Sequence, residues 1–228
     1  MATATNPPAP IQPALWLLIS PALPVGGYSY SQGLEYAVEA EWIRSANDVR
    51  DWLQGIAAAT LVHQDLAYLK RLHAATQCSD HATVKHCNQA LTASRESAEL
   101  LDEDRQMGAA LARLIRDVLS ADAAATLPEK PLFATAFAAA AVAEGIDCRS
   151  VLAAYAWVWH ENQVAAAIKL VPLGQTDGQR LMLEAGRRLD AYVDAAEAVE
   201  DSRLGLTLPG VALASARHEH QRTRLFRS

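Results

Sequence analysis

Apolar residues recur along this chain at the spacing of an α-helix. The clearest case lies between His86 and Ser120, where successive apolar positions are separated by seven, four, three and four residues: Leu100, Met107, Leu111, Leu114 and Val118. These steps place the side chains on one side of a helix, so the pattern predicts one buried stripe. The charged residues of the same stretch fall largely off the stripe, and we expect them on a solvated face: Glu99, Asp102, Glu103, Asp104 and Arg105.

Similar patterns, separated by prolines and glycines, predict helices along most of the chain. We expect them at 30–39, 47–77, 132–144, from 147 or 150 to 171, and at 176–199, with a short apolar segment at 14–19 before the first. Asn47 is the expected N-cap of the helix at 47–77, and Thr176 with Gln179 has the spacing of a capping box at the last. A pattern rich in alanine and leucine favours helices that pack closely. The predicted fold class is all-α.

The organisation that we expect is a single multi-helix domain between two less regular ends. Residues 1–10 are rich in proline and alanine, and we expect a flexible, disordered leader there. The helical domain covers 11–203, where 51% apolar residues over the whole chain are ample for a core. Residues 204–228 begin with two glycines and a proline and end strongly charged, which predicts an extended or conditionally ordered tail.

Charge and composition exclude several classes of protein. The formal net charge is −6 with both signs mixed along the sequence, which argues against general attraction to nucleic acid or to an anionic membrane. No stretch approaches the roughly 20 apolar residues of a membrane helix, and the N-terminus lacks the pattern of a signal peptide. Three cysteines form no disulfide framework. We expect a cytoplasmic protein.

The stretch from Ser20 to Glu35 contains two prolines and two adjacent glycines, Gly26 and Gly27. Prolines fix φ and glycines free it, so the backbone turns sharply there and then presents small hydroxyl and aromatic groups. Two interpretations stand side by side. The stretch is either a shaped recognition loop, or only the break before a helix capped by Ser29.

The stretch Ser20–Glu35 resembles the N-terminal motif of the UreF family of urease accessory proteins. Two further segments, 161–175 and 215–228, resemble motifs of that family in the same order, and 95–108 is a weaker match. The resemblance therefore covers nearly all of the chain. The tail departs from the family pattern at Ala216 and Arg222, where we expect a larger apolar residue and a more neutral or aromatic one.

The resemblance implies a non-enzymatic adaptor without a cofactor or catalytic residues. Proteins of this family are all-helical dimers that bind the accessory protein UreD, also called UreH, recruit the GTPase UreG, and bring both to apo-urease so that nickel is inserted. Carried onto this sequence, the resemblance implies partner-binding residues in the loop, the central segment and the tail: Gly26, Gly27, Tyr28, Ser29, Tyr30, Glu35, Lys169, Gly174, Gln175, Arg217, His218, Glu219, Arg222, Arg224, Leu225, Phe226 and Arg227.

Two other functions remain open on the sequence. The chain could be a nickel-binding metallochaperone, with His218 and His220 as weak candidate ligands, or with a histidine and cysteine cluster at 78–87: Cys78, His81, His86 and Cys87. It could also regulate the partner GTPase, with Lys169 or a tail arginine stabilising charge in phosphoryl transfer. The chain has no phosphate-binding loop of its own.

Overall fold

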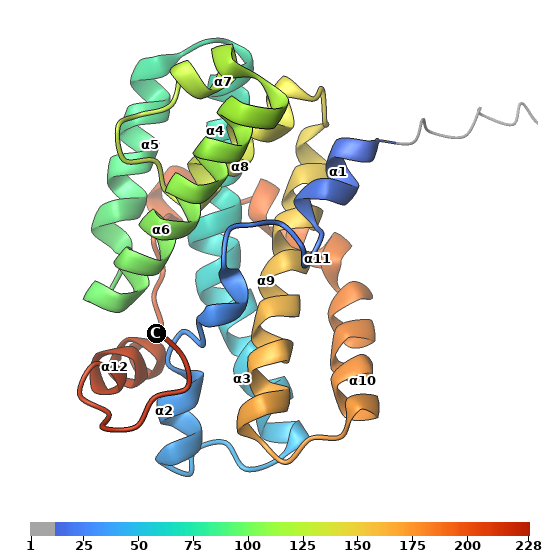
Figure 1. Ribbon diagram of the computed structural model, residues 1–228, viewed down its shortest axis with the longest axis vertical. Coiled ribbons are helices and arrows are strands. Elements are labelled where there is room, and N and C mark those ends of the chain that lie inside the picture. Colours follow the sequence, from blue (N-terminus) through green and yellow to red (C-terminus); the bar gives the residue numbers. More distant parts are fainter. Residues whose placement is uncertain (1–11) are drawn as a thin grey trace, which may run out of the picture.

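Every regular element of the described chain is a helix, which confirms the predicted all-α fold. The computed structural model describes residues 12–228, so the predicted leader at 1–10 lies outside the described residues. The α-helices are α1 Pro13–Leu18, α2 Leu34–Glu39, α3 Ala46–Ile56, α4 Ala67–Gln77, α5 His81–Ser94, α6 Ala98–Leu114, α7 Ala121–Ala125, α8 Phe133–Ala143, α9 Cys148–Leu170, α10 Gln175–Gly186, α11 Leu189–Glu197 and α12 Pro209–His218. Figure 1 shows α9 running through the length of the molecule.

The predicted helix at 47–77 is a continuous helical run of three parts. A π-helical segment, Ala57–Leu66, joins α3 to α4 without a break. The N-cap is Ser45 rather than Asn47, because the Ser45 hydroxyl accepts the Asp48 N–H while the Asp48 carboxylate accepts the Ser45 N–H. A π-helical run of ten residues is unusual, since π-helix mostly occurs as single widened turns.

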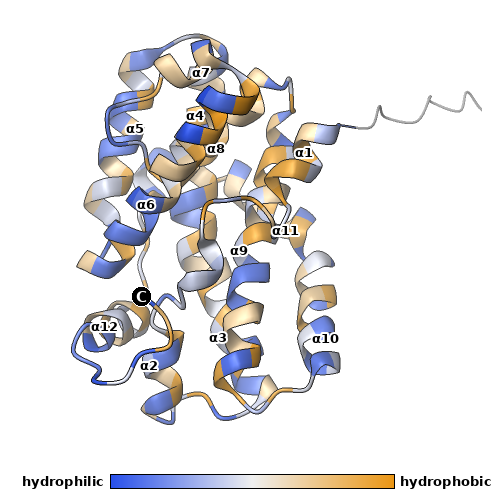
Figure 2. Ribbon diagram, in the orientation of Figure 1, coloured by the Kyte–Doolittle hydropathy of each residue, from blue (hydrophilic) through white to orange (hydrophobic). Residues whose placement is uncertain are grey.

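Helix α8 forms the centre of the larger core. Nine of its eleven residues are buried, most of them alanines, and it packs against α4 and α6. Figure 2 shows this helix as one of the most hydrophobic parts of the ribbon. Gly108 of α6 makes the close approach possible, because a Cβ there would lie 2.1 Å from the Pro131 carbonyl oxygen.

The apolar stripe predicted over 86–120 is only partly correct. The stretch is divided between α5 and α6, and a side-chain cap at Ser97 starts the second helix. Leu100, Met107 and Leu111 are buried as predicted, but Val118 is 64% exposed in a π-helical turn, Ile115–Leu119, that ends the run. The turn changes the side-chain register that the 3.6-residue period assumes.

Two other predicted helices differ from those observed. The helix expected at 30–39 begins only at Leu34, because Gln32 and Gly33 have positive φ angles of 53° and 81°. The helix expected at 176–199 is two helices, α10 and α11, with Gly174 as the N-cap of α10 and no capping box at Thr176. Helix α9 was expected to begin at residue 147 or 150, and its N-cap is Asp147.

The C-terminal segment, residues 204–228, is folded onto the rest of the chain rather than extended. Its helix α12 packs against α2 and α6, and the residues that follow return to the same place, where Phe226 and Ser228 are buried. Figure 1 shows this end of the chain beside α2 and α12. Within residues 12–228, no helix is both long enough and apolar enough to cross a membrane.

Candidate functional site: a surface built by the C-terminal segment

The first and the last sequence motifs lie side by side. The Ser31 N–H and hydroxyl both donate to the Ser228 carbonyl oxygen, at 2.7 and 2.5 Å, and the Arg227 N–H donates to the Ser29 carbonyl oxygen at 2.9 Å. The loop that contains Gly26 and Gly27 is thus joined to the end of the chain by backbone hydrogen bonds. These hydrogen bonds fix both segments at once.

Glu35 holds the C-terminal segment from inside. Its carboxylate accepts the Leu225 N–H at 2.6 Å and the Phe226 N–H at 2.9 Å, and the residue is 7% exposed. The prediction that Glu35 lies on a partner-binding surface is therefore wrong for this fold. A buried carboxylate is costly without donors, and here the backbone of the C-terminal segment supplies them.

His218 lies between two carboxylates. Its Nδ1 is 2.7 Å from Glu99 Oε2 and its Nε2 is 3.1 Å from Glu35 Oε2, and the side chain is fully buried. Both ring nitrogens of His218 therefore have a polar partner inside the fold. His218 is therefore neither an exposed contact residue nor an available metal ligand in this structure, in contrast to both predictions for it. Arg224 completes the group with a 2.6 Å ion pair to Glu99.

The second motif, 161–175, also contacts the C-terminal segment, because its Lys169 lies over the ring of Phe226. Phe226 is buried in a second apolar cluster with Leu34 of α2 and Val164 of α9. The Lys169 ammonium lies 5.4 Å from the centre of the Phe226 ring, within the range of a cation–π interaction. Phe226 was predicted to anchor a partner, but in this structure it anchors the C-terminal segment to its own chain.

The remaining predicted residues divide into exposed and buried groups. Tyr30 and Gly27 are buried, and a Cβ on Gly27 would lie 2.5 Å from Asn162 Nδ2. Gly26, Ser29 and Glu219 are partly exposed. The exposed group comprises Tyr28, Lys169, Gly174, Gln175, Arg217, Arg222, Arg224, Leu225 and Arg227.

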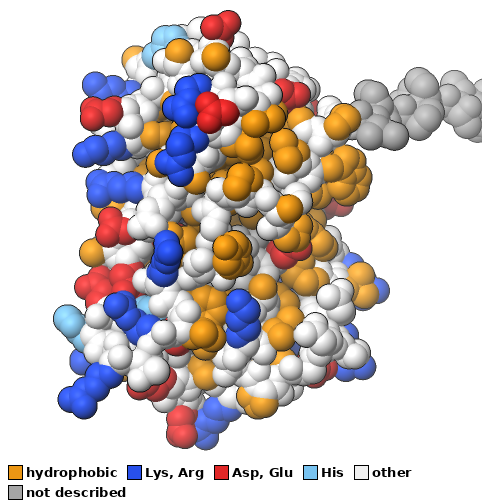
Figure 3. Space-filling model, in the orientation of Figure 1, with side chains coloured by type: hydrophobic (Ala, Val, Ile, Leu, Met, Phe, Trp, Pro, Cys, Tyr) orange, Lys and Arg blue, Asp and Glu red, His pale blue; other side chains and the backbone are white. Residues whose placement is uncertain are grey.

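The exposed members define a surface that we call the C-terminal face: Arg217, Arg222, Arg224, Leu225 and Arg227, with Tyr28 nearby on the loop joined to it. Leu225 and Tyr28 are 64% and 62% exposed. Figure 3 shows Lys and Arg side chains at the lower left of the molecule, where Figure 1 places the C-terminal segment, while most of the hydrophobic side chains in this view lie over the middle and upper right. Exposed apolar side chains beside arginines are typical of a protein-binding surface.

Sequence comparison identifies the family. A sequence model of the UreF family matches residues 43–186. A urease accessory protein UreF from Alkalilimnicola ehrlichii is 51% identical over 230 aligned residues, which cover 100% of each chain. A urease accessory protein UreF from Azoarcus sp. is 44% identical, and the match covers 99% of this chain and 100% of that protein. This chain belongs to the UreF family. The family that the motifs indicated is thereby confirmed.

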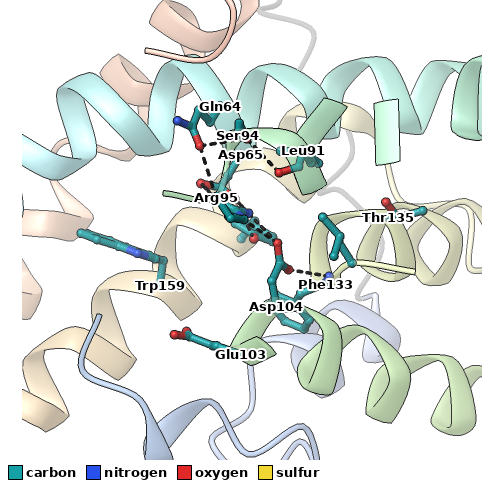
Figure 4. A network of polar contacts seen from close by, with 12 residues as sticks. Gln64, Asp65, Leu91, Ser94, Arg95, Glu103, Asp104, Phe133, Thr135 and Trp159 are labelled. Carbon is teal, nitrogen blue, oxygen red and sulfur yellow. Dashed lines mark hydrogen bonds and ion pairs between the residues drawn. The ribbon is translucent and has the colours of Figure 1, made fainter. Parts of the chain in front are cut away.

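This UreF-family chain also holds a buried charge cluster that the sequence patterns did not predict. Arg95 forms ion pairs with Asp65 at 2.5 Å and with Asp104 at 2.7 Å, and the Phe133 N–H donates to Asp104 at 2.7 Å. Figure 4 shows Arg95 between the two carboxylates. The cluster connects four parts of the chain: the π-helical segment with Asp65, the turn before α6 with Arg95, α6 with Asp104, and α8 with Phe133. The weaker UreF motif match at 95–108 contains Arg95 and Asp104, and it is the one signal in the sequence that could have indicated the cluster.

Glu103 and Asp104 are therefore buried, each 6% exposed, and the predicted solvated face is wrong at these positions. Burial raises the pKa of the Glu103 carboxyl to about 7, although hydrogen bonds from Gln32 and Ser228 oppose the shift. Burial also raises the pKa of Asp104, and the Arg95 guanidinium opposes it. The periodicity of α6 could not reveal this, because the partner charges come from other elements.

The proposed metal ligands do not come together. Among residues 12–228, the structure contains no group of three or more His, Cys, Asp or Glu side chains that could hold a metal ion. In the 78–87 cluster, Cys78 and His81 are exposed, whereas Cys87 is buried. His220 is exposed and His218 is occupied by carboxylates.

Proposed function

We propose that this chain is a non-enzymatic adaptor in urease maturation. It binds a UreD/UreH-like accessory protein and a UreG-like GTPase, and holds them on apo-urease while nickel is inserted into the active site. Membership of the UreF family supports the general role. The observation that carries the specific proposal is the anchored C-terminal segment, whose buried side holds Phe226 and whose other side exposes Leu225 and arginines.

The construction of the C-terminal face supports docking of a protein partner. Glu35 and His218 fix the backbone of the segment from inside, so that its exposed side chains are held in place before a partner arrives. A preorganised surface loses less conformational entropy on binding than a flexible one. Leu225 supplies an apolar contact, and Arg222 and Arg227 supply charge-assisted hydrogen bonds to an acidic patch on the partner.

A homodimer is part of the proposal. Large apolar side chains are exposed at sites away from the C-terminal face, including Trp16 at 64% and Leu183 at 57%. Exposed aromatic and aliphatic side chains of this size are often covered in an assembly. The chain can therefore bind a second copy through the surfaces around Trp16 or Leu183 and a different protein through the C-terminal face.

Reconstitution with purified partners tests the adaptor role. The chain, a UreD/UreH-like protein and a UreG-like GTPase are mixed in all combinations, and the masses are measured by light scattering. We expect the two partners to appear in one complex only when the chain is present. Arg222→Glu weakens this complex, whereas Arg113→Glu, at an exposed arginine of α6, leaves it unchanged.

Two results separate the other functions. Stoichiometric nickel in the isolated chain, without complex formation, would replace the adaptor by a metallochaperone. A change in GTP turnover when the chain is added to the GTPase alone would assign it a regulatory role in addition. If the partners assemble equally well without the chain, the adaptor proposal fails.

A further inference from the structure

A cavity of about 70 Å³ lies beside the buried charge cluster, between the loop at Gly27–Gln32, the π-helical segment, α6 and α9. Roughly 10–15 Å³ measured in this way holds one water molecule, so the cavity has room for several waters or for a small molecule. Its walls combine apolar side chains, such as Leu61, Met107 and Trp159, with polar and charged ones. Figure 4 shows Trp159 and Glu103 next to the Arg95 cluster.

Two of the lining residues carry polar atoms that are buried without a hydrogen-bond partner anywhere in residues 12–228. These are Thr60 Oγ1 and Gln163 Oε1. Gln163 is only 2% exposed, so bulk water does not serve its carbonyl oxygen. A buried acceptor without a donor is costly, and it is normally satisfied by something bound. The occupant of the cavity therefore has N–H or O–H groups to donate.

The charges that line the cavity are mostly negative. Arg95 is the single cationic residue in the lining, against four carboxyl groups: Asp65, Glu96, Glu103 and Asp104. Arg95 is engaged with Asp65 and Asp104. Glu103 is met only by the neutral donors Gln32 and Ser228, and Glu96 has no ion pair among the described residues. The unbalanced charge favours a cationic occupant, as do the aromatic rings of Trp159 and Phe133.

The backbone beside the cavity is unusual as well. Thr60, Leu61 and Asp65 all line it from the π-helical segment, Ala57–Leu66. Widened turns of this kind are often found at functional sites, since they redirect side chains that a regular helix would place elsewhere. The unpartnered Thr60 hydroxyl is one of the side chains on this segment.

We propose that this cavity binds a small nitrogenous cation, ammonium or a short primary alkylammonium ion. Its N–H groups donate to Gln163 and Thr60, and its charge is balanced by Glu96 together with the excess negative charge of Asp65 and Asp104 over Arg95. A divalent metal fits less well, because residues 12–228 contain no group of three His, Cys, Asp or Glu side chains arranged for one. The site is separate from the C-terminal face and does not depend on the proposed adaptor function.

Calorimetric titration of the full chain tests the site. The probes are ammonium chloride and methylammonium chloride, compared with sodium, potassium and tetramethylammonium chloride at equal ionic strength. We expect saturable binding for the first two and clearly weaker binding for the others, because sodium and potassium make no directional hydrogen bonds to Gln163 and Thr60, and tetramethylammonium is larger and has no N–H groups. Nickel chloride is titrated separately.

Three variants locate the binding. Glu96→Gln removes a charge and Gln163→Leu removes the unpartnered oxygen at similar size, and each is expected to weaken ammonium binding at least about tenfold. Glu144→Gln, at an exposed glutamate, is the matched control and leaves binding unchanged. Circular dichroism establishes that each variant is folded, and Glu96→Gln suffices if Gln163→Leu does not fold.

Four results would overturn the proposal. The first is the absence of saturable binding, which would leave a cavity filled by water only, and the second is equal binding of potassium or tetramethylammonium. The third is ammonium binding that both Glu96→Gln and Gln163→Leu leave unchanged. The fourth is nickel binding that Glu96→Gln abolishes, in a chain that does not bind ammonium.

Discussion

Glu35 and Phe226 are 191 positions apart in the sequence, yet the Glu35 carboxylate accepts the Phe226 N–H at 2.9 Å. The same carboxylate accepts the Leu225 N–H and contacts His218. One buried side chain therefore connects the loop motif near the start of the chain to the motif at its end. This contact keeps Leu225 exposed on one side of the segment and Phe226 buried on the other.

Replacing Glu35 is expected to release the C-terminal segment. Glu35→Ala leaves two backbone N–H groups without an acceptor and removes the contact to His218 Nε2, so the free energy of unfolding falls by about 2–4 kcal/mol. Urea denaturation measures the loss, and limited proteolysis detects earlier cleavage near residue 224. Glu39→Ala, at an exposed position of α2, is the control. Equal protease resistance in Glu35→Ala and wild type would contradict the anchoring role.

Arg95 is expected to be essential for stability. Arg95→Ala leaves Asp65 and Asp104 as buried carboxylates without a cation, which costs about 3–5 kcal/mol. Guanidinium denaturation measures the difference, with the exposed Arg113→Ala as a control that changes stability by no more than about 0.5 kcal/mol. An equally small effect at Arg95 would show that the cluster does not hold the helices together.

Stability is expected to depend on pH through Glu103. Its pKa is raised from 4.5 to about 7 by burial, so the folded state holds this proton more tightly than the unfolded state. The contribution of Glu103 to the free energy of unfolding is present in full below about pH 4.5. It is lost as the pH rises to about 7, which lowers the free energy of unfolding by roughly 3 kcal/mol. The charged groups nearest to Glu103 are Arg95 and Asp104, and burial also raises the pKa of Asp104.

Glu103→Gln isolates this contribution. The variant lacks the titrating carboxyl, so its unfolding free energy falls less than that of the wild type between pH 5 and 8 and is the higher of the two at about pH 8. Urea denaturation at a series of pH values measures both curves. Parallel curves for the two proteins would contradict the role of Glu103.

Two glycines are expected to respond oppositely to alanine. At Gly108 a Cβ would lie 2.1 Å from the Pro131 carbonyl oxygen, so Gly108→Ala forces α6 and α8 apart and costs about 1–3 kcal/mol or more. At Gly55, inside α3, no atom lies within 4 Å of the added Cβ. Gly55→Ala therefore stabilises the helix by about 0.5–1 kcal/mol. Thermal denaturation of the two variants, side by side, compares the signs directly.

Local sequence patterns predicted the helical class and several helix ends. Asp147 caps α9 and the continuous run to Gln77 is present, because capping and periodicity act over a few residues. The same reasoning failed at Asn47 and Thr176, where a neighbouring residue starts the helix instead.

The candidate surface was predicted at the level of segments but not of side chains. The family motifs named Glu35, His218 and Phe226 as partner-binding residues, but no local pattern could show that they face one another inside the chain. The burial of Glu103 depends on Gln32 and Ser228, which are distant in the sequence. Long-range contacts of this kind decide whether a polar residue lies on the surface or inside.

The central claim is that the C-terminal face binds the UreD/UreH-like partner. The most direct test compares Leu225→Asp with Val118→Asp, since both change a leucine or valine that is 64% exposed into aspartate at different places on the molecule. Light scattering of each variant mixed with the partner measures complex formation. We predict that Leu225→Asp fails to form the complex while Val118→Asp forms it like the wild type. Complex formation by Leu225→Asp at wild-type affinity would contradict the claim.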